Sequence, residues 1–267
     1  MPFTDIHSHI LPGFDDGARG DDDFLAMARA AVAGGTARMA ATPHCDLDTD
    51  PAAAARVAPA VESCRGLLMS EGVHLELLPG VEVRVNAGLF RAAGEGDLGE
   101  LRLGGPGEAG FILTDLPPID MPTATAEILF QVQLHGFTPI LAHPERNRHL
   151  STRLGLVREM ADRGIVLQVN AGSLEGIYGR AAARCAFALL DEGLAGLVAS
   201  DAHAPSGRGP DLSEAARIIA ARLGEEAARV LLEDNPGRAL AGEPLLKVAG
   251  RAPRRGLRSR FSRAGRA

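Results

Sequence analysis

The hydrophobic and polar positions of this chain predict short strands that alternate with longer helices. Seven apolar runs have the length of buried strands, and they span residues 3–7, 38–42, 75–83, 110–116, 138–143, 165–170 and 196–200. Apolar residues recur at helical spacing in residues 22–33, 52–70, 123–135, 152–163, 180–192, 212–223 and 225–233. This alternation is typical of βαβ units and a parallel sheet. Seven strands in about 200 residues favour a barrel over an open sheet, although periodicity alone does not separate the two.

Two segments depart from this pattern. Residues 85–107 hold seven glycines and little periodicity, which predicts a long loop or a short hairpin. Asn235-Pro236 predicts a turn near the end of the folded body. The composition then changes, and we divide the chain into a folded domain, residues 1–246, and a basic C-terminal tail, residues 247–267.

Charge is distributed unevenly between these two parts. The formal net charge is −6, but the tail has eight basic residues and no acidic ones, so the first 246 residues hold 20 basic against 34 acidic side chains. An acidic body argues against a nucleic-acid-binding groove. The Arg-, Gly- and Ala-rich tail fits either a solvated disordered end or a docking element for an anionic membrane surface or a kinase.

Cysteine usage and the first residues exclude other classes of protein. Cys45, Cys64 and Cys185 are odd in number and lack C-x-x-C spacing, which excludes a disulfide framework and a cysteine-type zinc site. None has an arginine six residues later, so the nucleophile loop of cysteine-dependent phosphatases is absent. No basic and apolar leader is visible and no apolar run reaches ~18 residues, so we expect a cytoplasmic protein without a membrane span.

Histidines and carboxylates gather at the predicted carboxyl ends of the strands. Nine such side chains are candidate metal ligands: His7, His9, Asp16, His44, Glu82, Asp115, His143, Asp201 and His203. Asp15 stands beside Asp16 in the first loop. All strand ends of a parallel barrel open onto one face, so residues nearly 200 positions apart converge. The spacings His7/His9 and Asp201/His203 place each pair on one side of a strand.

This donor set indicates metal-assisted chemistry. Imidazole and carboxylate without thiolate favour Mn, Fe or Zn in an open catalytic site. Nine ligands exceed what one ion takes up, which predicts two or three divalent ions with a bridging carboxylate, an arrangement that recurs in phosphoester cleavage. Arg146, three residues after His143, and Arg208, five after His203, offer planar donors for phosphate oxygens.

The motifs resemble those of a known family. Asp5-Ile6-His7-Ser8-His9-Ile10-Leu11-Pro12, followed by Asp15-Asp16-Gly17, is similar to the opening motif of PHP (polymerase and histidinol phosphatase) proteins. More narrowly, the chain resembles the bacterial manganese-dependent protein-tyrosine phosphatases of capsular and exopolysaccharide systems. The resemblance continues through Thr42-Pro43-His44, Gly80-Val81-Glu82, His143-Pro144-Glu145-Arg146, Val169-Asn170-Ala171-Gly172-Ser173 and Ser200-Asp201-Ala202-His203 with Arg208.

This resemblance implies a fold and a division of the ligands. The fold is a distorted (β/α)7 TIM-like barrel, the PHP fold, with three metal ions, manganese before iron or zinc. His7, His9, Glu82 and Asp201 would hold the first ion; Glu82, Asp115 and His143 the second; and Asp16, His44 and His203 the third. Arg146 and Arg208 would bind phosphate. The family usually places glutamate where Asp115 stands, so the second site is where this chain departs from the pattern.

The resemblance also implies an activity. The expected reaction is hydrolysis of phosphotyrosine by a metal-activated hydroxide, on a bacterial tyrosine autokinase that regulates polysaccharide synthesis and export. Its phenolate leaving group has a pKa of about 10, which lessens the need for a general acid. A PHP phosphatase of small molecules such as histidinol phosphate is the alternative enzyme. A non-catalytic adaptor is the alternative class, and it predicts eroded ligands, whereas this ligand set is complete.

Overall fold

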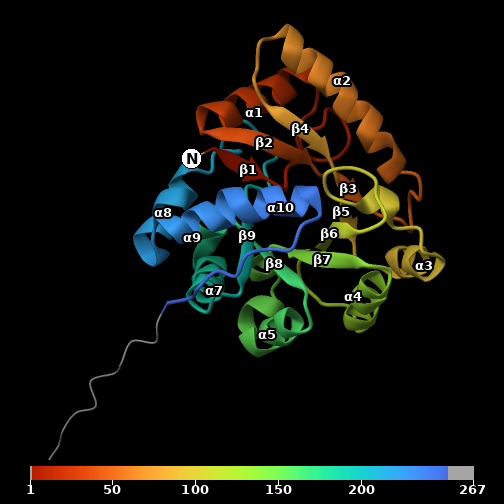
Figure 1. The fold of residues 1–267 in the computed structure, drawn as a ribbon, viewed down its shortest axis with the longest axis vertical. Helices are drawn as coiled ribbons and strands as arrows, with labels where there is room; N and C mark the ends of the chain where they lie inside the picture. Colours follow the sequence, from red (N-terminus) through yellow and green to blue (C-terminus); the bar gives the residue numbers. More distant parts are fainter. Residues whose placement is uncertain (1, 252–267) are drawn as a thin grey trace, which may run out of the picture.

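The computed structural model describes residues 2–251 of the chain (Figure 1). The strands are β1 (Phe3–Asp5), β2 (Thr36–Ala41), β3 (His44–Cys45), β4 (Glu76–Pro79), β5 (Glu82–Arg84), β6 (Gly110–Asp115), β7 (Phe137–Ala142), β8 (Val166–Asn170) and β9 (Ala195–Ala199). The α-helices are α1 (Asp21–Ala33), α2 (Val57–Ser70), α3 (Ala87–Glu95), α4 (Thr125–Leu134), α5 (Leu154–Asp162), α6 (Ala171–Leu174), α7 (Gly179–Asp191), α8 (Ser213–Leu223), α9 (Glu225–Arg229) and α10 (Asn235–Ala241). Every predicted strand run overlaps one of these strands, and residues 75–83 overlap two.

The strands form two parallel sheets, which confirms the predicted α/β class with parallel pairing. Their orders are β1-β2-β4 and β3-β5-β6-β7-β8-β9. The sheets share two stretches of chain, because β2 is followed at once by β3 and β4 by β5, and the pairing β2–β4 is followed by β3–β5. Pro43, which lacks an N–H for a ladder bond, interrupts the first stretch, and Gly80 interrupts the second.

The carboxyl ends of the first and last strands are hydrogen-bonded to each other. Ser8 forms a parallel bridge with Ala202. The Asp201 amide donates to the carbonyl of His7 at 2.9 Å, and the His9 amide donates to the carbonyl of Ala202 at 2.8 Å. Residues almost 200 positions apart are therefore neighbours at the ends of β1 and β9.

The amino ends of the strands are covered by helix α10, which crosses them in Figure 1. Ala239 and Leu240 pack with buried residues of several strands, among them Ala40, Leu113 and Leu197. Burial of such side chains contributes about 1.5–3 kcal/mol each for the larger ones. A second apolar cluster fills the space between the strands and the surrounding helices. The apolar core thus closes the amino ends and leaves the carboxyl ends for polar side chains.

The loop or hairpin predicted for residues 85–107 is wrong, because residues 87–95 form α3. The Asn86 side chain caps this helix by accepting from the Leu89 amide at 3.1 Å. The glycines that suggested a loop have other roles. A Cβ on Gly88 would lie 2.6 Å from the Asp48 amide nitrogen, so glycine lets the helix pack closely, and Gly96 at φ 76° ends it.

The turn predicted at Asn235-Pro236 is also wrong, because these residues begin α10. Proline is tolerated in a first helical turn, where its missing N–H has no partner to lose. Of the predicted tail, residues 247–251 are irregular, and the Arg251 amide donates to the Asp191 carbonyl at 2.8 Å. Residues 252–267, on which the prediction of disorder or docking mainly falls, lie outside the described residues. Within residues 2–251, no helix is both long and apolar enough to cross a bilayer.

Candidate metal centre and anion site

The nine predicted ligands lie together at the carboxyl ends of the strands. His7 and His9 follow β1, and Asp201 and His203 follow β9, while register places His44 opposite Glu82 on β3 and β5. Within the described residues, donor atoms come within 4.8 Å of one another in four sets, which together include all nine: His9, Asp16, His44 and His203; His7, His9 and Asp201; His7, Glu82 and His143; and His44, Glu82 and Asp115. In this geometry Asp115 groups with His44 and Glu82.

Two fully buried histidines point lone pairs at carboxylates. His7 Nδ1 lies 3.0 Å from Gln168 Oε1, and His9 Nδ1 lies 2.6 Å from Asp15 Oδ2. Because these oxygens accept, each Nδ1 carries the proton and each Nε2 presents a lone pair. His7 Nε2 faces Glu82 Oε1 at 3.3 Å, and His9 Nε2 faces Glu82 Oε2 at 3.5 Å. Lone pairs that face each other need a proton or a cation between them.

Glu82 is the buried centre of this arrangement. Its Oε1 lies 3.1 Å from His143 Nε2, and its Oε2 lies 2.7 Å from His44 Nδ1 without the geometry of a hydrogen bond. Burial raises the pKa of this carboxyl, but His7, His143 and His44 outweigh it and hold the pKa well below its usual range. Glu82 therefore stays ionised inside the protein and contacts several rings at once.

Without a metal ion, protons provide the compensating positive charge. Burial lowers the pKa of His9, but Asp15, Asp201 and Glu82 raise it to about 10. The His203 ring centroid lies 3.9 Å from that of His9, and burial with the positive charge of His9 lowers the His203 pKa to about 4. Two rings this close do not both carry a positive charge. A cation would compete with the proton of His9 for the same nitrogen.

The outer ligands are held less firmly. The Asp16 side chain is 64% exposed, and its Oδ1 lies 3.5 Å from His44 Nε2 and 3.3 Å from His203 Nε2. The His44 side chain is 41% exposed. Asp115 is buried, and its Oδ2 pairs with Arg84 at 3.0 Å. Burial and the Glu82 charge raise the pKa of Asp115.

Backbone strain occurs at two of the predicted ligands. His143 has φ 33° and Asp201 has φ 51°, and they are the described non-glycine residues with positive φ. Such conformations cost about 1–3 kcal/mol each and persist where surrounding structure enforces them. A tight approach occurs at Gly17, where a Cβ would lie 1.9 Å from the His9 carbonyl oxygen. Glycine there lets the Asp15–Asp16 loop close over His9.

Asp201 connects the histidines to the two predicted arginines. Its Oδ1 lies 3.4 Å from His7 Nε2 and 3.3 Å from His9 Nε2. Its Oδ2 accepts from Arg208 at 3.3 Å and pairs with the Arg146 guanidinium. Burial raises the pKa of this carboxyl, but His7 and His9 hold it well below its usual range. The Asp201 carboxylate thus contacts both the clustered histidines and the two arginines.

Several contacting residues received no role from the sequence. Gln168 orients His7, Asp15 orients His9, and Asn170 Nδ2 donates to Asp201 Oδ2 at 2.9 Å. The available signal was weak: Gln168 and Asn170 are the polar residues of an otherwise apolar strand run and stand two positions apart. Buried Glu145 accepts from the Asn170 amide at 2.9 Å, which ties the strand ends of β7 and β8 together.

The donor set fits divalent cations. Every inward-facing group is an imidazole nitrogen or a carboxylate oxygen, and the histidines are oriented by outer hydrogen bonds as metal ligands usually are. The other histidines, His74, His135 and His149, belong to none of the donor sets found in the described residues.

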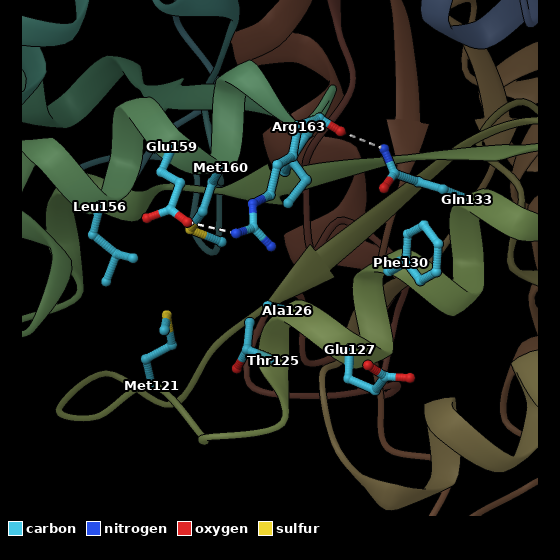
Figure 2. A pocket seen from close by; sticks show the side chains of 11 residues that line it. Met121, Thr125, Ala126, Glu127, Phe130, Gln133, Leu156, Glu159, Met160 and Arg163 are labelled. Carbon is cyan, nitrogen blue, oxygen red and sulfur yellow. Dashed lines mark hydrogen bonds and ion pairs between the residues drawn. The ribbon is translucent and has the colours of Figure 1, made fainter.

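A large cavity lies elsewhere, in a groove between α4 and α5 (Figure 2). It has a volume of about 570 Å³ and is lined by apolar side chains such as Phe130, Leu156 and Met160. At the edge of the groove, Glu159 of α5 pairs with Arg163, the residue that follows this helix. It contains none of the nine predicted ligands, so cavity size does not mark the candidate site.

The chain is similar to known tyrosine-protein phosphatases. The chain is 34% identical over 230 residues to the tyrosine-protein phosphatase YwqE of Bacillus subtilis, covering 86% of this chain and 89% of that protein. It is 25% identical over 240 residues to the tyrosine-protein phosphatase CpsB of Streptococcus pneumoniae, covering 87% and 96%. A solved structure from work on YwqE and CpsB, described there as unique metal-dependent tyrosine phosphatases, superposes with a TM-score of 0.82 at 30% identity and covers 94% of this chain and all of that one.

More distant structures share the fold alone. D-hydantoinase matches with a TM-score of 0.51 at 13% identity over 93% of this chain and 73% of its own. The family model described as capsular polysaccharide synthesis, CpsB/CapC, matches residues 3–241. The chain belongs to this CpsB/CapC family of capsular polysaccharide synthesis.

Proposed function

We propose that this chain is a metal-dependent protein-tyrosine phosphatase of capsular or exopolysaccharide synthesis. The observation that carries the proposal is the Asp201 carboxylate, whose two oxygens face a cluster of metal-type donors on one side and two arginines on the other. A phosphoryl group is an anion that needs both kinds of partner. The names of the relatives supply the substrate class, phosphotyrosine.

We propose that the two sheets together form a distorted (β/α)7 barrel. Support comes from the joined ends of β1 and β9 and from the stretches β2–β3 and β4–β5, each of which counts as one interrupted strand. On this description the predicted domain, residues 1–246, is one barrel with its site at the carboxyl ends, where such folds place their chemistry.

The proposed ligands are the nine clustered side chains, with Glu82 as the bridging carboxylate. On the division that the resemblance implies, His7, His9, Glu82 and Asp201 would hold one ion; Glu82, Asp115 and His143 a second; and Asp16, His44 and His203 a third. Among the donor sets of the described residues, Asp115 shares one with His44 and Glu82 and not with His143. We propose manganese as the native metal, as the resemblance to the manganese-dependent phosphatases implies; imidazole and carboxylate donors together fit manganese, iron or zinc. Ions bound there would polarise phosphoryl oxygens and lower the pKa of a water molecule.

Side chains of the protein would bind the phosphoryl group and orient the ligands. Arg146 and Arg208 direct guanidinium N–H groups toward Asp201 Oδ2, and the same donors would bind the phosphoryl oxygens and offset their charge. Gln168 and Asp15 hold the rings of His7 and His9 in one orientation. The phenolate of tyrosine leaves with a pKa of about 10, so the site needs no strong proton donor for it.

We propose a bacterial tyrosine autokinase as the protein substrate. Such a kinase draws on cytoplasmic ATP, so we place the reaction in the cytoplasm. Support comes from the family description and from the relatives' names, which join capsule synthesis to tyrosine dephosphorylation.

Hydrolysis of p-nitrophenyl phosphate tests the proposal directly. We expect turnover with added Mn²⁺, its loss with excess chelator, and a fall of at least about 100-fold in His143→Ala. His74→Ala is the matched control, because this exposed histidine lies outside the donor sets. Equal rates in wild type and His143→Ala would overturn the proposed site.

Substrate class is tested separately. We expect faster turnover of a phosphotyrosine peptide than of histidinol phosphate at equal concentration. The reverse order would favour the small-molecule phosphatase.

A further inference from the structure

The single tyrosine of the chain lies beneath the arginine side of the site. Tyr178 is half-buried, directly before α7. The guanidinium carbon of Arg146 lies 4.2 Å above the centroid of its ring. Tyr178 also lines a pocket of about 160 Å³ together with Arg208. One aromatic side chain therefore contacts Arg146 and borders the same pocket as Arg208.

The backbone of the preceding turn fixes the position of the Tyr178 ring. A Cβ on Gly172 would lie 2.9 Å from Tyr178 Cε2, so a larger residue would push the ring away from its place. The Ile177 amide donates to the Gly172 carbonyl at 2.8 Å, and the Gly172 amide donates to Asn170 Oδ1 at 2.9 Å. The close approach of the Tyr178 ring therefore explains why glycine stands in the third position of Asn170-Ala171-Gly172-Ser173.

The same turn is anchored to the arginine-bearing loop. Buried Glu145, the neighbour of Arg146, accepts from Ser173 Oγ at 2.7 Å and from the Asn170 amide at 2.9 Å. The loop that carries Arg146 and the turn that carries Tyr178 therefore keep a fixed separation. A shift of the Tyr178 ring would therefore also shift the Arg146 guanidinium above it.

Both arginines need such support. A long guanidinium side chain loses rotamer freedom when it binds an anion, and two adjacent guanidiniums repel each other. Arg208 Nε is buried and has no hydrogen-bond partner among the described residues, so it is a donor free for a ligand oxygen. The aromatic face of Tyr178 supports the Arg146 guanidinium before the ligand arrives, and Tyr178 and Arg208 line one pocket beside it.

We propose that Tyr178 is a positioning residue that holds Arg146 and Arg208 as a fork for the oxygens of a phosphomonoester. This inference rests on the proposed phosphatase function. Arg146 covers one face of the Tyr178 ring and Gly172 abuts its edge, so the ring is assigned to the arginine and not to the aromatic ring of the substrate. Its effect is therefore on the affinity for the phosphoryl group.

Inorganic phosphate is the probe that tests this role. We expect Tyr178→Leu to weaken phosphate binding about tenfold, since the cation–π contact beneath Arg146 is lost. Tyr178→Phe keeps the ring under Arg146 and should lose only about threefold. Phosphate affinity is measured by calorimetry on the Mn²⁺-loaded protein and as an inhibition constant against p-nitrophenyl phosphate, with metal content and melting temperature determined for each variant.

The chain offers a matched control for the aromatic contact. Arg222 lies 4.6 Å above the ring of Phe187, away from the site, so Phe187→Leu removes the same kind of contact without touching the fork. We expect its phosphate affinity to equal that of the wild type. Because Tyr178 is the single tyrosine and tryptophan is absent from the sequence, saturating phosphate should also change the tyrosine emission of the wild type.

The outcomes separate this inference from the function on which it rests. Wild-type phosphate affinity in Tyr178→Leu, or unchanged emission at saturating phosphate, overturns the positioning role while turnover of aryl phosphate continues. Graded loss from Phe to Leu with intact metal content supports it. Absence of turnover in the wild type overturns the phosphatase function, and calorimetry still reports whether Tyr178 supports anion binding.

Discussion

The inner and outer halves of the ligand cluster differ in how firmly the chain holds them. The inner half, His7, His9, Glu82 and Asp201, is fully buried, and its two rings are oriented by Gln168 and Asp15. The outer half, Asp16 and His44, has side chains 64% and 41% exposed. Within the described residues, the donor-set neighbours of Asp16 are His9, His44 and His203. The inner half is preorganised by the fold, whereas a bound ion must complete the outer half.

Electrostatics explains why the inner half needs so many partners. Burying a carboxylate without compensation costs several kcal/mol. Glu82 and Asp201 avoid this cost by facing histidines and arginines, which hold both pKa values well below their usual range. Asp16 remains in contact with water and needs no such partner. The difference predicts graded responses to substitution.

Removal of the inner charge should have the largest effect. Since loss of a residue that merely orients a ligand costs 10–100-fold, we expect Asp201→Asn to reduce kcat/KM for p-nitrophenyl phosphate by about 10³-fold or more. The free energy of unfolding of the metal-free protein should fall by about 3 kcal/mol, because protonated histidines lose their partner. Steady-state kinetics and urea unfolding in chelator check both values. A variant with wild-type activity would place the chemistry elsewhere.

An outer substitution should act through metal affinity instead. We expect Asp16→Asn to lower activity about tenfold at limiting Mn²⁺ and to regain most of it at high Mn²⁺. The stability of the metal-free protein should change by less than about 0.5 kcal/mol, since the side chain is exposed. Metal titration and urea unfolding measure the two quantities. A loss of metal-free stability as large as that of Asp201→Asn would remove the distinction between the halves.

The pH dependence of stability should differ between the metal-free and the loaded protein. In the metal-free protein the pKa values of His9 and His143 are raised to about 10 and about 9. Groups with raised pKa contribute stability that is present below their unfolded value of about 6.5 and is lost as pH rises through 9 to 10. The melting temperature in chelator should therefore fall over that window.

Added Mn²⁺ should oppose this loss, because deprotonated imidazole binds metal more tightly. Thermal unfolding in chelator and in Mn²⁺, each from pH 6.5 to about 10, tests the sign. Parallel curves in the two conditions would show that protons and metal do not compete at these rings.

Sequence periodicity located most elements because strand runs and helical spacing are local properties. Periodicity failed where a glycine is required by tertiary packing. Gly88 lies in α3 and packs against the Asp48 backbone, and no local pattern distinguishes such a glycine from one in a loop. It also gave no sign of β3, a two-residue strand whose pairing with β5 depends on the third dimension.

The candidate ligands could be named from sequence because they lie at or near the predicted carboxyl ends of strand runs, and parallel topology brings strand ends together. Their orienting partners could not. Gln168 and Tyr178 act through contacts at 3.0 Å to a ring and 4.2 Å to a guanidinium, across long sequence separations. A lone Gln or Tyr has no motif that announces such contacts. The groove between α4 and α5 was likewise invisible, because helix spacing does not specify the gap between two helices.

The smallest expected effect concerns the thiol beside the outer half. Cys45 follows exposed His44, yet it is buried, and desolvation together with Asp50 and Asp46 raises its pKa to about 11. Only a thiolate is a strong nucleophile, and at neutral pH a thiol with this pKa is almost wholly protonated. We expect iodoacetamide on the native protein to leave both Cys45 and the rate of p-nitrophenyl phosphate hydrolysis unchanged, as measured by mass spectrometry and kinetics. Stoichiometric inactivation with Cys45 alkylated would instead assign the nucleophile to sulfur, and the ligand cluster would then be structural. Unchanged turnover would instead be consistent with attack by a metal-activated water at the ligand cluster, with no part for a cysteine.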